Sequence, residues 1–457
     1  MNVQVVARFL GLLLVAVGLF MAVPALFAWS HGGGDLAAIL ASAALTMAAG
    51  GLLILLSRPR GELLLRDSFL VVALGWLLAS AFGALPFFLS GAIPSFTDAF
   101  FESASGFTTT GASILVRVED LPHGLLFWRS LTHWLGGMGI IVLSVAILPL
   151  AGIGGTQLYK AEIPGPTLDK IAPRIRQTAS TLWLVYLLLT MLQTLLLLAA
   201  GLNLHESLCH SFATIATGGF STRTASIAGF NSLFVEAVVL VFMFLAGANF
   251  TLHYHFLKGK ASACWKSEEF RFYLGIVPVF TVLLAADNLL AGPLRAGAAL
   301  RHSLFQVVSI ITTTGFATTD FGLWPATARF VLLFLMLIGG CAGSTGGGIK
   351  VARVLIILKQ GLAELRKTLH PRAVVPVRVD GRSVPQEVVL NILGFLFFYA
   401  GILFLATLAL TLMGLDILTA YSSVASALGN IGPGLGAVGP AASYQQIPLA
   451  GKWLLAF

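Results

Sequence analysis

Unbroken apolar segments, long enough to cross a lipid bilayer, dominate this sequence. They cover residues 3–29, 37–57, 67–90, 124–150, 181–201, 232–257, 272–291, 327–349 and 388–413. A helix crosses a bilayer with about 20 apolar residues. Lipid offers no partner for backbone polar groups, so only helices and closed barrels span it. Because these segments are continuous rather than alternating, they predict an all-α membrane protein.

Composition excludes a water-facing surface over most of the chain. Hydrophobic residues make up 57% and charged residues 10%, with a mean hydropathy of +0.93, whereas soluble domains carry about 25% charge. The first apolar segment exceeds the roughly 7–15 residues of a signal-peptide core, so we expect it to be retained as a helix. Three distant cysteines, Cys209, Cys264 and Cys341, predict no disulfide framework.

The net charge of +8 is concentrated in four loops, 57–66, 156–180, 258–271 and 350–386. Together with Arg8 these loops hold 20 of the 27 Lys and Arg residues. Such a bias is typical of cytoplasmic loops, so it predicts a cytoplasmic N-terminus. It also accounts for the charge without a nucleic-acid partner.

Four shorter, half-polar runs, 96–111, 204–219, 298–315 and 417–432, each end on a glycine. They are too short to span and lie opposite the basic loops, which predicts re-entrant helices that stop inside the membrane and return as extended chain. The glycines are 108, 96 and 117 residues apart, an internal repeat. Six residues before each glycine lies a small residue: Ser105, Ala213, Ser309 and Ser426.

The repeat predicts four units of helix, pore helix and helix in pseudo-fourfold arrangement around a central pore. We expect two N-terminal helices at 1–60, followed by pore repeats at 61–155, 156–260, 261–365 and 366–457. The second spanning helix of the fourth repeat begins near Leu449, and with Phe457 as the last residue it is expected to be incomplete.

The residues before each glycine suit a cation filter. A dehydrated cation needs replacement oxygens, which rings of backbone carbonyls supply in potassium filters, and glycine reaches the backbone angles required. The predicted filter residues are Thr109, Thr110, Gly111, Thr217, Gly218, Gly219, Thr313, Thr314, Gly315, Asn430, Ile431 and Gly432. Ordinary Gly/Thr turns are the alternative, which the regular recurrence of the pattern disfavours.

Specific motifs make the chain similar to a known family. They are Thr-Thr-Thr-Gly-Ala at 108–112, Ala-Thr-Gly-Gly-Phe-Ser-Thr at 216–222, Thr-Thr-Thr-Gly-Phe-Ala-Thr at 312–318, Asn-Ile-Gly-Pro-Gly-Leu-Gly at 430–436, Trp-Leu-Gly-Gly-Met-Gly at 134–139, Ala-Glu-Ile-Pro-Gly-Pro at 161–166 and Gly-Cys-Ala-Gly-Ser-Thr-Gly-Gly-Gly-Ile-Lys at 340–350. The chain resembles, over essentially its whole length, the TrkH family of membrane subunits of bacterial Trk potassium uptake systems, in the Trk/Ktr/HKT superfamily.

The resemblance implies potassium transport across a bacterial inner membrane. In that family, glycine at the key position of all four loops accompanies K⁺ preference, while serine in the first loop accompanies Na⁺ in some plant relatives. It also implies a homodimer and a cytosolic TrkA-type regulatory subunit that binds NAD or ATP. The candidate contact surfaces are 159–176 and 350–386. No cofactor is expected in the chain, and K⁺ is its cargo.

A glycine-rich stretch at 339–348 interrupts the second helix of the third repeat, because each glycine costs a helix about 1 kcal/mol relative to alanine. By resemblance, it is an intramembrane gating loop below the filter. Its residues are Gly339, Gly340, Gly343, Ser344, Thr345, Gly346, Gly347, Gly348 and Lys350. It does not match a phosphate-binding loop, since Ile349 separates the last glycine from Lys350.

Other charged and metal-ligating residues have less specific interpretations. Acidic residues near the short runs could concentrate cations or could be ordinary solvated loop charges. Glu102 and Asp320, nearest the predicted filter, are the better candidates for attracting cations; the others are Asp98, Glu119 and Asp120. Arg129 is expected to pair rather than conduct. A metal site at His253 and His255 lacks further ligands.

Two other function classes remain open. A secondary transporter with alternating access would favour inverted repeats or paired buried acids, whereas these repeats run parallel. An intramembrane enzyme would need a catalytic pair, and no spacing supports one. The sequence therefore favours passive, gated flow driven by the membrane potential, which supplies about 2.3 kcal/mol per charge per 100 mV.

Overall fold

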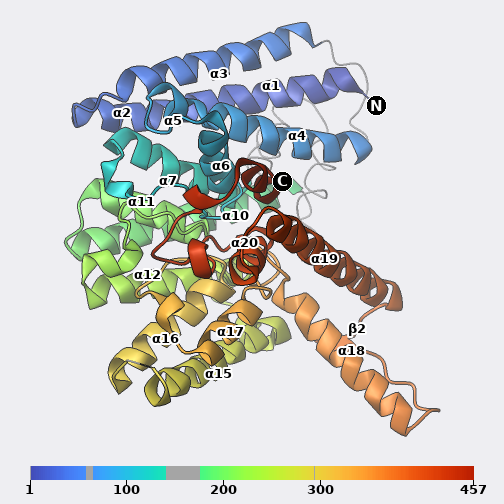
Figure 1. Cartoon of the computed structure of the whole chain (residues 1–457). Helices are drawn as coiled ribbons and strands as arrows, with labels where there is room; N and C mark the ends of the chain where they lie inside the picture. Colours follow the sequence, from blue (N-terminus) through green and yellow to red (C-terminus); the bar gives the residue numbers. More distant parts are fainter. Residues whose placement is uncertain (1, 58–64, 140–174, 293) are drawn as a thin grey trace.

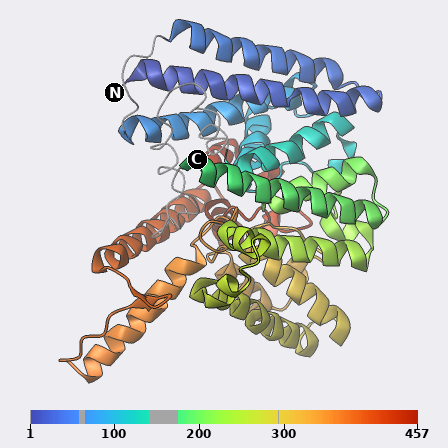
Figure 2. The same cartoon turned by 180° about the vertical axis from the view of Figure 1, so that it is seen from behind.

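The computed structural model of the chain describes residues 2–57, 65–139, 175–292 and 294–457. Within these residues the fold is helical, apart from one two-stranded sheet (Figures 1 and 2). The predicted all-α membrane class is confirmed.

The chain begins with two long antiparallel helical segments that lie side by side in both views (Figures 1 and 2). Helices α1 (Val3–Phe20) and α2 (Ala22–Ser30) form the first, and α3 (Leu36–Leu56) returns beside them. A Cβ on Gly11 would meet the Gly50 carbonyl oxygen at 2.7 Å, so small residues allow this close approach, as is common between membrane helices.

Four successive sets of helices follow, each with a long helix, a short helix, a returning segment and a second helix. The first set is α4 (Leu65–Gly83), α5 (Leu85–Leu89), α6 (Phe96–Phe107) and α7 (His123–Gly137), and the second is α10 (Ile175–Ala199), α11 (Leu204–Ile215), α12 (Leu233–Ala246), α13 (Phe250–Leu257) and α14 (Ser262–Lys266). The third is α15 (Glu268–Leu290), α16 (Ala296–Ile311), α17 (Ala326–Leu335) and α18 (Val351–Leu369), and the fourth is α19 (Gln386–Leu412), α20 (Ile417–Gly429) and α21 (Leu449–Ala456). Short 3₁₀ turns are η1 (Val118–Asp120), η3 (Ser226–Phe230), η4 (Phe321–Leu323), η5 (Gly436–Val438) and η6 (Tyr444–Gln446).

Among the described residues, 6 helical segments are long and apolar enough to cross a membrane, or 7 if one bent pair counts as a span. The 6 are Val3–Ser30, Leu36–Leu56, Phe69–Leu89, Ser180–Ala199, Glu268–Leu290 and Gln386–Leu412. The chain is therefore a multi-pass membrane protein.

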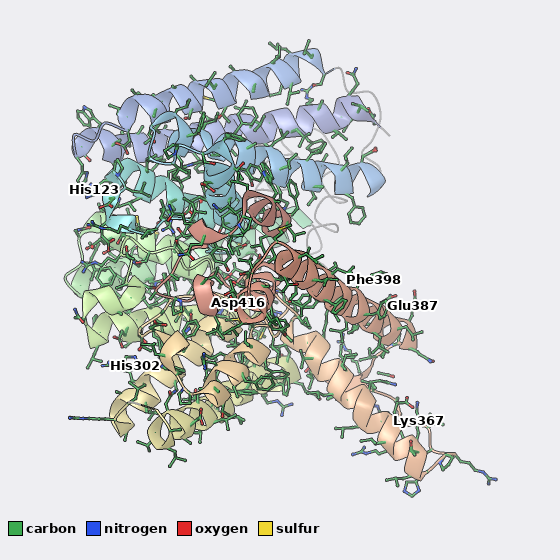
Figure 3. All side chains as sticks on the ribbon, viewed as in Figure 1. His123, His302, Lys367, Glu387, Phe398 and Asp416 are labelled. Carbon is green, nitrogen blue, oxygen red and sulfur yellow. The ribbon has the colours of Figure 1, made fainter. Side chains whose placement is uncertain are left out.

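The four predicted short helices are present as α6, α11, α16 and α20, each followed by extended chain. Three of them begin at side-chain caps: the side chains of Ser95, Asn203 and Asp416 accept hydrogen bonds from backbone N–H groups in the first turn, which satisfies donors that a helix start leaves free. In Figure 3, His302 of α16 lies at the opposite end of the bundle from Lys367 of α18.

Two predicted spans are not straight helices. The run 232–257 is not one continuous helix, because α12 and α13 meet at 102°; the Asn249 side chain accepts from Thr251 N at 2.8 Å and starts α13. In the run 327–349 the helix ends at Leu335, and glycine-rich chain follows as expected. The end of the run 124–150 and most of the loop 156–180 lie outside the described residues.

Helix α18, the hairpin of β1 (Arg378–Val379) and β2 (Arg382–Ser383), and the start of α19 project from the bundle as an arm (Figures 1 and 2). The hairpin pairs Arg378 with Ser383 and Val379 with Arg382. The arm contains the basic loop 350–386 and is joined to α15 by the ion pair of Lys359 with Glu268.

The last helix, α21, contacts α6. Lys452 of α21 donates to Asp98 of α6 at 2.6 Å, with side-chain exposures of 4% and 20%, and Trp453 stacks on Phe100 at 4.7 Å between ring centroids. These contacts close the fourth set of helices onto the first.

We expect Lys452→Met to lower the thermal stability of the protein by about 2–3 kcal/mol, because it leaves the Asp98 carboxylate without its charged partner. Thermal unfolding in detergent measures this. The double variant with Asp98→Asn removes both charges and should recover part of the loss. A single variant as stable as the wild type would contradict the inferred closure.

Candidate functional site

Four loops follow the short helices, and they share one unusual backbone conformation. We name them loop 1 (108–111), loop 2 (216–219), loop 3 (312–315) and loop 4 (429–432). The last glycine of each loop has positive φ: +79° at Gly111, +79° at Gly219, +80° at Gly315 and +99° at Gly432. The residue two positions earlier is also left-handed: +59° at Thr109, +53° at Thr217, +59° at Thr313 and +55° at Asn430.

The left-handed threonines were not predicted from the sequence. A β-branched residue at positive φ is rare and costs about 1–3 kcal/mol, so it persists only where its surroundings impose it. Three such residues at matching positions indicate that the surrounding structure imposes the loop conformation. In each loop, two left-handed residues are separated by one residue that is not left-handed. This pattern prevents the loop from continuing as a regular strand, in which successive carbonyls alternate in direction.

The backbone N–H groups of the loops bond back to their own short helices. The backbone N–H of the residue before each glycine donates to the backbone carbonyl of the small residue six positions before that glycine. The pairs are Thr110 to Ser105 at 2.9 Å, Gly218 to Ala213 at 2.8 Å, Thr314 to Ser309 at 2.9 Å and Ile431 to Ser426 at 3.0 Å. Within the described chain, the carbonyls of the two residues before each glycine accept no hydrogen bond. These oxygens are therefore available to a ligand.

The four glycines lie in a closed ring. A Cβ on Gly111 would collide with the Gly218 carbonyl, one on Gly219 with the Thr314 carbonyl, and one on Gly315 with the Ile431 carbonyl. A Cβ on Gly432 would meet the Thr110 and Gly111 carbonyls at 2.9 Å each. Each loop thus contacts the next in chain order, and loop 4 contacts loop 1.

Side chains support the ring from behind. In loop 1 the Thr110 hydroxyl bonds the Thr108 hydroxyl at 2.7 Å and donates to the Asn430 amide oxygen of loop 4 at 3.0 Å. In loop 3 Thr314 bonds Thr312 at 2.8 Å. Loop 4 differs, because its Gly432 carbonyl already accepts from the Ser426 and Tyr444 hydroxyls at 2.7 and 2.8 Å.

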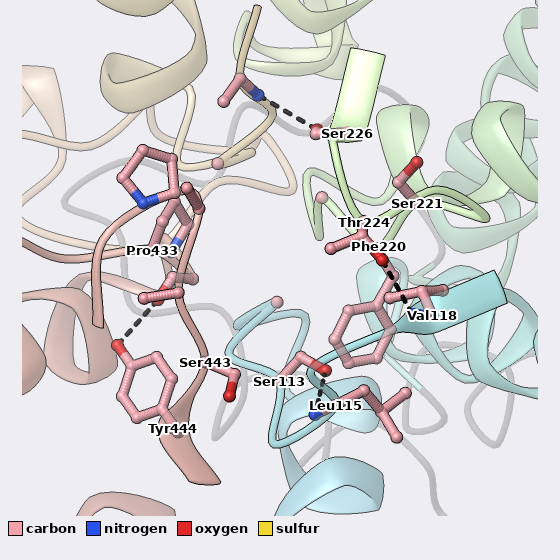
Figure 4. A pocket seen from close by; sticks show the side chains of 18 of the residues that line it. Ser113, Leu115, Val118, Phe220, Ser221, Thr224, Ser226, Pro433, Ser443 and Tyr444 are labelled. Atoms are coloured by element: carbon pink, nitrogen blue, oxygen red, sulfur yellow. Dashed lines mark hydrogen bonds between the residues drawn. The ribbon is translucent and has the colours of Figure 1, made fainter. Parts of the chain in front are cut away.

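A pocket opens onto the ring, and all four glycines line it (Figure 4). Its walls come from the segments that return after each loop, including Ser113, Phe220, Ala317 and Tyr444. Of the described residues that line it, Arg129 and Arg223 are the charged ones, and none is acidic.

The glycine-rich stretch lies against the other side of the loops. Gly347 N donates to the Thr313 hydroxyl at 2.7 Å, and a Cβ on Gly347 would meet the Gly429 carbonyl of loop 4 at 2.5 Å. The Thr345 hydroxyl donates to the Ile215 carbonyl at 3.0 Å, at the end of α11. The stretch therefore contacts three of the four repeats next to the ring.

This stretch is fixed at both ends by backbone contacts. Ile338 and Ile349 form a parallel bridge, and Cys341 N donates to the Gly247 carbonyl at the α12–α13 bend at 2.8 Å. Lys350 donates to the Gly346 carbonyl inside the stretch. The bend that the sequence did not predict thus provides a contact surface for the glycine-rich stretch.

Comparison with known proteins shows which family the chain belongs to. A family profile described as "TrkH: Cation transport protein" matches residues 36–457. The chain belongs to the TrkH family. It is 42% identical over 434 residues to the Trk system potassium uptake protein TrkH of Escherichia coli K12, covering 93% of this chain and 89% of that one. The Halomonas elongata TrkH is 40% identical over 459 residues, covering 100% and 95%.

A solved structure agrees with the fold. The crystal structure of the potassium transporter TrkH from Vibrio parahaemolyticus superimposes with a TM-score of 0.89 at 40% identity, covering 100% of this chain and 95% of that chain. The relatives of this TrkH-family chain are cation transport proteins rather than enzymes.

Glu102, which was expected to attract cations, has another role in this TrkH-family chain. It is 1% exposed, accepts from Arg129 Nε at 2.6 Å, and also accepts from Ser113 Oγ and Ile114 N at 2.9 Å each. Arg129 also donates to the Ser221 carbonyl at 2.9 Å. The expectation that Arg129 pairs is confirmed, and the pair joins the segments that follow loops 1 and 2.

The other outer acids also have partners. Asp98 pairs with Lys452, Asp120 with Arg117, and Asp320 accepts from Gly322 N. Partial burial would raise the pKa of Glu119, but hydrogen bonds from Thr224 lower it below its usual value. An electrostatic role of Asp320 remains a prediction.

The histidines at 253 and 255 have no cluster of further metal ligands around them among the described residues. His253 Nε2 bonds the Leu245 carbonyl at 2.8 Å, and the described residues contain no group of three or more His, Cys, Asp or Glu able to hold a metal.

We expect Gly219→Ala to lower K⁺ uptake strongly, because its Cβ would overlap the Thr314 carbonyl. Gly91→Ala is the matched control: Gly91 has φ +74° but no atom near its Cβ position, so the variant carries only the backbone penalty of about 1–2 kcal/mol. Uptake into vesicles compares them. Equal activity of the two variants would contradict the crowded ring.

Proposed function

We propose that this chain conducts K⁺ into the cell through the ring of loops 1–4. The closed ring of four glycine-centred loops, with carbonyls that no backbone N–H occupies, supports this most strongly. Carbonyl oxygens arranged around an axis replace the hydration shell of K⁺. The filter residues would be those of the sequence prediction, from Thr109 to Gly432, and the four pore repeats would surround them.

The helix directions favour a cation at the ring. The short helices end at Phe107, Ile215, Ile311 and Gly429, immediately before or at the start of the loops. The C-terminal end of a helix carries about half a negative charge, so four ends around one axis attract a cation. The relatives' names point to K⁺, and no loop carries the serine that accompanies Na⁺ preference.

The glycine-rich stretch 339–350 would be the gate. Its contacts with the ends of α11 and α16 and with loop 4 support a position across the path below the ring. Movement of this stretch away from the ring loops would break the bond from Gly347 N to the Thr313 hydroxyl and the bond from Thr345 to the Ile215 carbonyl, and its glycines have no side chains to repack. Flow would be passive, with the membrane potential as driving force.

The remaining expectations complete the proposal. The chain would lie in a bacterial inner membrane with its N-terminus and the arm in the cytoplasm, as the basic residues favour. It would act as a homodimer with a TrkA-type NAD- or ATP-binding subunit, which the family resemblance supports. The arm 350–386 is the described candidate contact, whereas 159–174 lies outside the described residues.

Gly111→Ser should lower the ratio of K⁺ to Na⁺ permeability, because its side chain would displace the Gly218 carbonyl that it contacts. Flux into vesicles under both ions measures this. Gly32→Ser, at φ +64° with open space around it, should keep the wild-type ratio. An unchanged ratio in Gly111→Ser would exclude loop 1 from the filter.

Thr345→Val should raise K⁺ flux in the absence of any cytosolic partner, because it removes the hydrogen bond from the gate to the Ile215 carbonyl. Thr407→Val removes a similar hydroxyl bond, at 2.7 Å within α19, and serves as the control. If both variants matched the wild type in basal vesicle flux, this contact would have no part in closure.

A further inference from the structure

Loop 2 differs from loops 1 and 3 in a way that backbone conformation does not explain. The position before the key glycine is Thr110 in loop 1 and Thr314 in loop 3, but Gly218 in loop 2. Gly218 is not among the residues with positive φ, so glycine is not required there for its conformational freedom. Another constraint excludes a side chain.

That constraint is the imidazole of His133 on α7. A Cβ placed on Gly218 would fall on the His133 ring, nearest to its Nδ1 atom. His133 is 0% exposed and comes from the first repeat, 85 residues before the loop that it contacts. The space behind loop 2 is therefore filled by a neighbouring repeat rather than by the loop's own side chain.

Loop 2 also lacks the hydroxyl pair that supports its neighbours. In loops 1 and 3 the threonine before the glycine bonds a threonine two residues earlier, at 2.7 Å for Thr108 and 2.8 Å in loop 3. The corresponding residues of loop 2 are Ala216 and Gly218, which have no hydroxyl. His133 thus lies behind loop 2, whereas a threonine pair supports loops 1 and 3.

The same face of α7 also contacts Phe220, the residue that follows Gly219. The His133 ring lies 4.0 Å from the Phe220 ring between centroids, and the Arg129 guanidinium, one turn earlier, lies 3.5 Å from the Phe220 centroid. Neither nitrogen of His133 has a hydrogen-bond partner among the described residues. Leaving a buried polar group without a partner destabilises a protein, so the presence of an imidazole here calls for an explanation other than stability.

We propose that His133 is a positioning residue of the filter: its imidazole holds Gly218 so that the Gly218 carbonyl stays in the ring beside Gly111. This inference rests on the proposed function of the ring and adds a determinant of selectivity from outside the four loops. Removing the imidazole leaves loop 2 without support on that side, and the spacing of the carbonyl oxygens then becomes less defined. Adding a side chain at position 218 without removing the imidazole disrupts the loop.

A double-variant cycle tests the pair. His133→Ala should fold and still conduct, with a several-fold lower ratio of K⁺ to Na⁺ flux in lipid vesicles. Gly218→Thr alone should lose both thermal stability and flux, because the two side chains would occupy the same space. The double variant should be more stable in detergent than Gly218→Thr and should regain K⁺ flux.

Leu131→Ala is the matched control. Leu131 lies on the same helix, is 3% exposed, and belongs to the apolar core shared with the N-terminal helices. This variant should lose stability but keep the wild-type ion ratio, which separates positioning of the filter from a general loosening of α7.

Two results would overturn the inference: a wild-type ion ratio in His133→Ala, or a double variant no more stable than Gly218→Thr. These results are distinct from failure of the proposed function, in which wild-type vesicles would show no preference for K⁺ at all. The stability comparison decides the steric pairing in either case.

Discussion

The hydrogen bond from each loop back to its short helix determines the rest of the site. The N–H of Thr110, Gly218, Thr314 and Ile431 each donates to a carbonyl five residues upstream, which satisfies the donors of extended chain inside a membrane, where unpaired groups are costly. The adjoining carbonyls stay free. The left-handed threonines are tolerated because this bond and the neighbouring loops impose the conformation. The other features of the site either contact these loops from behind or, like the glycine-rich stretch, lie against one side of the ring.

Much of this could be predicted from the sequence, because membrane helices and glycine-centred repeats leave local signals. The short helices, the four glycines and the small residue six positions before each glycine all follow from pattern. The small residue acquires its meaning only in the structure, where its carbonyl accepts the loop N–H. The sequence did not predict the left-handed Thr109, Thr217 and Thr313, since threonine normally avoids this conformation.

Contacts between distant segments could not be predicted, because no local pattern encodes them. Glu102 was expected to face cations, yet it is buried against Arg129; one sequence cannot reveal which arginine lies beside an acid. The bend between α12 and α13 interrupts an apolar run that looks continuous, and its purpose is visible only where Gly247 meets the glycine-rich stretch. Likewise, the glycine at 218 is explained only by His133. The four repeats therefore share a backbone plan but use different supports.

The most direct test of the central claim is to locate a K⁺ substitute in crystals of the protein. Rb⁺ or Tl⁺ can be identified by anomalous scattering. The account predicts a peak on the axis of the ring, surrounded by the carbonyls of Thr110, Gly218, Thr314 and Ile431. A peak confined to the outer pocket, or none near the ring in protein that transports K⁺, would contradict it.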